Sequence, residues 1–132
     1  MRRVVLLLPV LLVSGCGQSD DRAAVRRVTE RFVTAFAQSQ GDVACAALSE
    51  DTRAELVSQE GEACATAVGS LDLEGGKVTR VVVEVTSALV VLSSGERVYL
   101  GKTANGWRLS AVGCLPKDGP PDRYPMDCEL SA

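Results

Sequence analysis

The chain changes character at Gly75 and Gly76, and this division constrains its fold more than any other feature. Before the two glycines, apolar residues such as Val25, Val28 and Phe32 recur at spacings of three and four, which is the period of an amphipathic helix. After the glycines, β-branched residues predominate, as they do in strands. Helical segments followed by strand segments predict an α+β fold, in which helices cover one face of an antiparallel sheet.

The helical half divides into one long helix and several short ones, because glycines interrupt it. The long helix is expected to run to about Gln38, with Ser19, Asp20 or Asp21 as its N-cap. Shorter helices are expected at 43–48, from Ser49 or Asp51 to about 57, and at 62–68. Helices this short bury little surface alone and must depend on other contacts.

The second half predicts an antiparallel meander of about four strands. They are expected at 78–86, 88–92, 97–102 and 107–112. Asn105-Gly106 is a strong hairpin signal, because both residues tolerate positive φ. The proline-rich stretch 115–126 predicts no regular element, and 128–130 is expected to return along the sheet edge.

The first residues resemble the signal peptide of a bacterial lipoprotein. Arg2 and Arg3 precede an apolar stretch at 4–13, and the small residues Ser14 and Gly15 lead into Cys16. A membrane-spanning helix needs about 20 apolar residues, so this shorter stretch is expected to be a leader. The resemblance implies cleavage before Cys16 and acylation of Cys16 with diacylglyceryl and palmitate chains. The alternative is an ordinary secretory signal in which Cys16 is incidental.

This interpretation divides the chain into a leader (1–15), an acylated cysteine with a short tether (16–21) and one domain (22–132). It places the domain on the extracytoplasmic face of the cell membrane, held there by lipid. The net charge is −3, and removal of Arg2 and Arg3 makes it about −5. That sign disfavours nucleic acid as a partner.

The remaining cysteines are expected to form disulfides, since an exported protein meets an oxidising compartment. Four cysteines allow three connectivities, and we favour the two local pairs, Cys45–Cys64 and Cys114–Cys128. A zinc site is the alternative, but the chain has no histidine and no Cys-x-x-Cys motif. We therefore expect no metal and no other cofactor. The lack of histidine also excludes Ser-His-Asp and Cys-His catalytic arrangements.

Four stretches of the chain resemble the small NTF2-like lipoproteins of bacteria. These stretches are 28–36, 41–48, 106–114 and 124–128. The resemblance implies a cone, in which a long helix and shorter helices pack on a curved antiparallel sheet with a cavity between them. Catalytic relatives place carboxylates in that cavity, often with histidine or tyrosine. No such motif can be matched in this chain, so the resemblance implies no catalytic residue.

Three residues are candidates for lining a cavity. Glu84 shares the mixed face of the first strand with Arg80, and it would act as a general base if that face lined a cavity. The alternative, which we favour, is a solvent-facing cross-strand charge pair. Tyr99 and Trp107 would line a ligand pocket, although a tryptophan after a hairpin glycine is also typical of a core position.

Four arginines of the long helix are candidates for contact with the membrane. They are Arg22, Arg26, Arg27 and Arg31. Residues 17–21 extend at most about 17 Å, so the helix stays close to the lipid headgroups. Anionic lipids attract basic residues at this distance, and we expect the arginines to face the membrane. The alternative is a solvated helix face with an Arg26–Glu30 ion pair.

Together these features predict a lipid-anchored extracytoplasmic module without catalytic activity, which binds an envelope protein or a small apolar molecule. One alternative is a small cavity enzyme that uses carboxylate or tyrosine acid–base chemistry. Another is a structural lipoprotein of the cell envelope. The enzyme would need a buried carboxylate that faces an open cavity, and the binding module would not.

Overall fold

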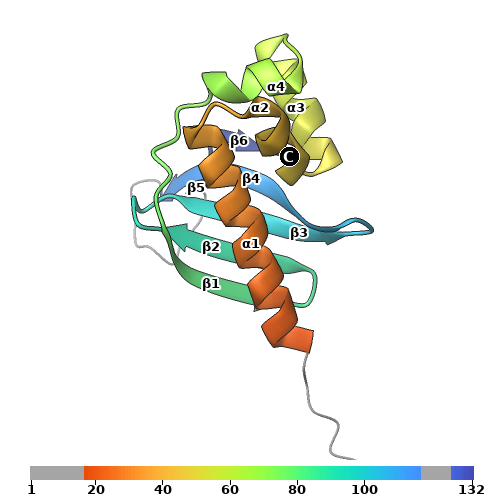
Figure 1. Cartoon of the computed structure of the whole chain (residues 1–132), viewed down its shortest axis with the longest axis vertical. Helices are drawn as coiled ribbons and strands as arrows, with labels where there is room; N and C mark the ends of the chain where they lie inside the picture. Colours follow the sequence, from red (N-terminus) through yellow and green to blue (C-terminus); the bar gives the residue numbers. More distant parts are fainter. Residues whose placement is uncertain (1–16, 117–125) are drawn as a thin grey trace, which may run out of the picture.

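The computed structural model describes residues 17–116 and 126–132, which form helices followed by a curved antiparallel sheet (Figure 1). The helices pack on one face of the sheet, as the order of the segments predicts. Cys16 and the leader lie outside the described residues. None of the helices in the described ranges has the length and apolar character needed to cross a membrane. The helices, the strands, one hydrophobic core cluster and both disulfides lie within the described ranges.

The long helix α1 (Gly17–Ala37) starts earlier than expected. Ser19 and Asp20 therefore lie within its first turns and do not cap it, and the expected tether at 17–21 is helical. The physical reason is tertiary, because Asp21 in the second turn is held by side chains from the sheet. The same side of α1 buries Val25 and Phe32 against the sheet, because they follow Asp21 by four and eleven residues.

Three short helices and a 3-10 turn follow α1. They are α2 (Gly41–Ala47), α3 (Glu50–Glu60), α4 (Cys64–Ala67) and η1 (Val68–Ser70). The hydroxyl of Ser49 accepts a hydrogen bond from the Thr52 N–H over 3.2 Å, so Ser49 caps α3 as expected. Gly61 ends α3 with φ of 71°, a left-handed conformation that glycine adopts without strain. The disulfide Cys45–Cys64 joins α2 to α4.

The sheet contains the four expected strands and two short ones. Its strands are β1 (Val78–Glu84), β2 (Ser87–Leu92), β3 (Arg97–Thr103), β4 (Gly106–Pro116), β5 (Met126–Asp127) and β6 (Leu130–Ser131). The order is β1-β2-β3-β4-β5, and β6 also pairs with β4. The C-terminal end therefore returns along the sheet edge, as predicted, and the Cys114–Cys128 disulfide ties it to β4.

The first strand ends two residues before the predicted boundary. Glu84 pairs with Ser87, so Val85 and Thr86 form the turn between β1 and β2. Val85, which was expected within this strand, consequently lies in the turn and is 88% exposed. Val81 and Val83 do pack against the core.

The space between α1 and the sheet is filled by the hydrophobic core. Phe32 from α1 belongs to one buried cluster with Val90, Leu100 and Leu109 from the central strands. The resemblance implied a cavity in this space, and buried side chains occupy it instead. An open hollow lined only by strand residues lies on the other face of the sheet.

A buried carboxylate fixes the connection between the two halves of the chain. Glu96, only 4% exposed, accepts a hydrogen bond from the Gly75 N–H over 2.5 Å and one from the Ser94 hydroxyl over 3.3 Å. The carboxylate thus links the glycine loop to the turn between β2 and β3. The sequence analysis did not single out Glu96.

Candidate functional site

The sheet face that turns away from α1, here called the outer face, carries its side chains in three rows across the strands. Pairing places Arg80, Val91 and Arg97 in one row, the basic row. The next row, the apolar row, consists of Val82, Leu89, Tyr99 and Ala111. The third, the open row, consists of Glu84, Ser87, Gly101 and Arg108.

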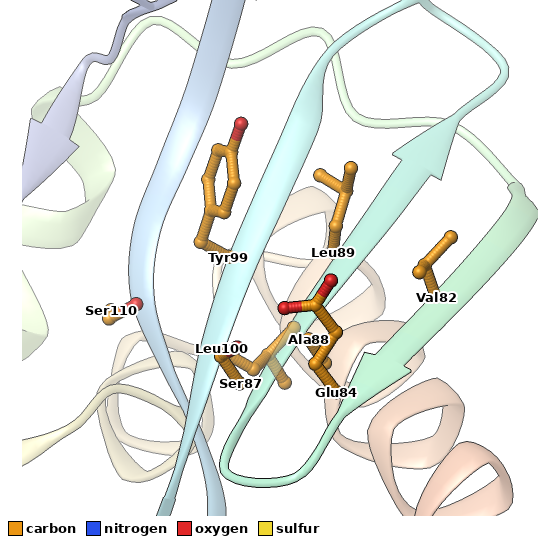
Figure 2. Close-up of a pocket in the computed structure, with 8 residues that line it drawn as sticks. All are labelled: Val82, Glu84, Ser87, Ala88, Leu89, Tyr99, Leu100 and Ser110. Carbon is orange, nitrogen blue, oxygen red and sulfur yellow. The ribbon is translucent and has the colours of Figure 1, made fainter.

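A hollow of about 300 Å³ lies on this outer face, along the apolar and open rows (Figure 2). Its lining residues are Val82, Glu84, Ser87, Ala88, Leu89, Tyr99, Leu100 and Ser110. Figure 2 shows the side chains of Tyr99, Leu89 and Val82 on the near side of the strands, with the helices behind. Val82, Leu89 and Tyr99 are each half-buried, so they offer apolar surface without closing the site.

The middle of the open row carries very small side chains beside the hollow. Gly101 has no side chain, and a Cβ built there would have nothing within 4 Å. Its pairing partner on β2 is Ser87, whose side chain is also small. The sequence analysis missed Gly101, although a glycine inside a strand is a signal for a gap or a close approach.

Glu84 and Tyr99 both line the hollow. The Tyr99 hydroxyl points away from the Glu84 carboxylate, so the two groups do not converge on one point (Figure 2). Glu84 is also exposed, so water solvates its carboxylate. This arrangement lacks the buried carboxylate that acid–base catalysis would need.

Arg80 and Glu84 share the outer face, but their backbone positions lie roughly 13 Å apart along β1, at about 3.3 Å per residue. Neither the Arg26–Glu30 nor the Asp21–Lys102 ion pair involves Glu84.

Trp107 lies on the other face of the sheet and is a core residue, 3% exposed. Its Nε1–H donates to Asp21 Oδ1 over 2.9 Å, and Lys102 Nζ donates to the same oxygen over 3.0 Å. The hydrogen bond from Trp107 is the main cause of a lowered pKa of Asp21, and the hydrogen bond from Lys102 lowers it further. Trp107 therefore anchors the start of α1 to β3 and β4 and does not line the hollow.

The four arginines of α1 are exposed and form two rows along the helix. Arg22 and Arg26 are one helical turn apart, as are Arg27 and Arg31, and the two rows are roughly 140° apart around the axis. Arg26 lies 3.6 Å from Glu30, which is the predicted ion pair. The arginines thus cover the solvent side of α1 broadly and not as a narrow stripe.

Within the described ranges, no three histidine, cysteine, aspartate or glutamate side chains gather in a way that would hold a metal ion. No protein-family model matches the chain, and searches of curated proteins and of solved structures give no match either. The function is therefore inferred from the geometry of the outer face and from the sequence of the leader.

Proposed function

We propose that this protein is a binding module without catalytic activity, which takes a small apolar molecule in the hollow of its outer face. The observation that carries the proposal is the hollow itself, about 300 Å³ in volume and walled by half-buried apolar side chains. Ligand pockets begin at about this size and are lined mainly by apolar and aromatic groups with a few polar ones. Leu89 and Tyr99 supply the apolar wall, and Ser87, Ser110 and Glu84 supply the polar groups.

Binding fits this site better than acid–base catalysis. The enzyme alternative needs a buried carboxylate that faces an open cavity, whereas Glu84 is exposed. The Tyr99 hydroxyl points away from Glu84, which leaves no position where both would reach one substrate atom (Figure 2). The enzyme interpretation therefore has less support than a site that only holds its ligand.

We further propose that the domain is held at the extracytoplasmic face of the membrane by acylation of Cys16. The leader sequence supports this anchor, and the two disulfides are consistent with an oxidising compartment. Because α1 begins at Gly17, residues 17–21 rise only about 7.5 Å as helix, instead of about 17 Å as extended chain. The domain would then lie directly on the lipid headgroups.

The anchor would bring the exposed arginines of α1 close to the membrane, and we propose that anionic lipid attracts them. Each basic residue near such a surface gains about 1 kcal/mol, within a Debye length of about 8 Å. Residues 17–132 should bind anionic vesicles better than neutral ones, and replacement of all four arginines by Gln should abolish the difference. Equal binding to both vesicles would leave α1 as a solvated helix.

The fold is also the basis for proposing kinship with the NTF2-like lipoproteins, since helices on a curved antiparallel sheet are what that resemblance implies. The binding proposal does not depend on this kinship. It is tested by NMR titration of residues 17–132 with 1-octanol, a small neutral amphiphile. Shifts confined to amides of Val82, Leu89, Tyr99 and Gly101 would support the proposal, and shifts spread over other elements would contradict it.

A further inference from the structure

Glu84 lies at the end of the hollow, and its side chain is exposed. Among the residues that the structure describes, it takes part in neither the Arg26–Glu30 nor the Asp21–Lys102 ion pair. Figure 2 shows its carboxylate near Leu89, at one end of the apolar row. A carboxylate in this position accepts hydrogen bonds and carries a negative charge that nothing nearby offsets.

The arginines of the outer face are too distant to neutralise Glu84. Arg80 lies roughly 13 Å away along β1, and Arg108 lies three strand spacings away, or roughly 14 Å. Both separations exceed the Debye length of about 8 Å at physiological salt. Arg108 is also engaged elsewhere, because its guanidinium donates to the Trp107 carbonyl over 2.8 Å.

The backbone holds Glu84 at a defined point of the site. Glu84 pairs with Ser87 at the closing position of the two-residue turn between β1 and β2, and Ser87 pairs in turn with Gly101. The side chain that carries the carboxylate therefore belongs to a paired strand residue and not to a long loop. Adjacent to it, Val82 and Leu89 begin the apolar row.

From this arrangement we propose that the ligand of the hollow is a small amphiphile with an ammonium group, which Glu84 binds while the apolar body lies along Val82, Leu89 and Tyr99. The inference rests on the proposed function and adds the charge of the ligand. A hollow of about 300 Å³ is at the lower end of the range for ligand pockets, which suits a small molecule such as a primary amine with a short alkyl or aryl chain.

Three probes of equal chain length test the charge of the ligand: octylamine, 1-octanol and octanoate. We expect octylamine to bind residues 17–132 about fivefold more tightly than 1-octanol at low salt. This ratio is the largest gain in affinity expected from an exposed ion pair. The preference should disappear in Glu84→Gln and at high salt. Glu55→Gln, an exposed residue of α3, serves as the matched control and should keep the preference.

The outcomes separate this inference from the proposed function. If none of the probes binds in the hollow, the proposed function fails. If 1-octanol binds there as tightly as octylamine, or Glu84→Gln leaves the preference unchanged, only the inference about charge is overturned. Tightest binding by octanoate would also overturn it and would assign the ligand's charged group to the basic row.

Discussion

The disulfide between Cys45 and Cys64 should make a large contribution to the free energy of unfolding. The two cysteines are 19 residues apart in sequence, and the chain-entropy relation then gives a stabilisation of about 3 kcal/mol. The bridge also holds α4, a helix of only four residues, far below the length that is stable alone. We therefore expect Cys45→Ala/Cys64→Ala to lower the free energy of unfolding by about 3 kcal/mol.

Urea unfolding of residues 17–132, followed by circular dichroism, measures this loss. A loss of about 3 kcal/mol corresponds to a fall in melting temperature of roughly 12 °C, at about 4 °C per kcal/mol. The control is Cys114→Ala/Cys128→Ala, which opens a loop of 14 residues and should cost a similar amount on entropy alone.

Hydrogen exchange distinguishes the two bridges. Amides at 61–70 should exchange faster in the first double variant and remain unchanged in the second. A loss below about 1 kcal/mol in the first variant, or unchanged exchange at 61–70, would refute the reasoning. Packing of α4 against its neighbours would then hold this region without the bridge.

Three further predictions follow from single residues. Glu96→Ala should lower the free energy of unfolding by about 1–3 kcal/mol in urea, because the Gly75 N–H loses its buried acceptor, whereas the exposed Glu74→Ala should have little effect. Folding lowers the pKa of Asp21, so the stability that its ionised carboxylate contributes is complete above about pH 4 and is lost as the pH falls through the pKa of Asp21 in the folded protein. Asp21→Asn should remove this part of the acid dependence when unfolding is measured as a function of pH. Cys16→Ser should release the protein from membranes or leave it unprocessed, and an unacylated mature N-terminus found by mass spectrometry in the unsubstituted protein would contradict the anchor.

The local signals in the sequence were sufficient to predict most of the fold. The helix start at Ser49 and the strand-forming residues after Gly76 are signals that act over a few residues, and the structure confirms them. The pairing of nearby cysteines is a similarly local inference. The start of α1 was missed because Asp21 is held by Trp107 and Lys102, which are distant in sequence.

The hollow could not be predicted, because it arises from register across several strands. Gly101 leaves a gap only because Ser87 stands opposite it, and sequence periodicity does not reveal that pairing. The same is true of Glu96, whose burial depends on the loop that reaches it from Gly75. Glu84 and Tyr99 were selected by residue type, and only the strand order brings them to one site.

The most direct test of the central claim fills the hollow. Gly101→Leu places a side chain where a Cβ meets nothing within 4 Å, so the fold should be retained. Gly69→Leu is the matched control, since a Cβ at Gly69 also meets nothing within 4 Å, and Gly69 lies in η1, away from the outer face. We predict that the dissociation constant for 1-octanol, measured by NMR titration, rises at least tenfold in Gly101→Leu and is unchanged in Gly69→Leu, a difference of about 1.4 kcal/mol. Unchanged binding in a folded Gly101→Leu variant would contradict the proposal that the outer face of the sheet is the binding site.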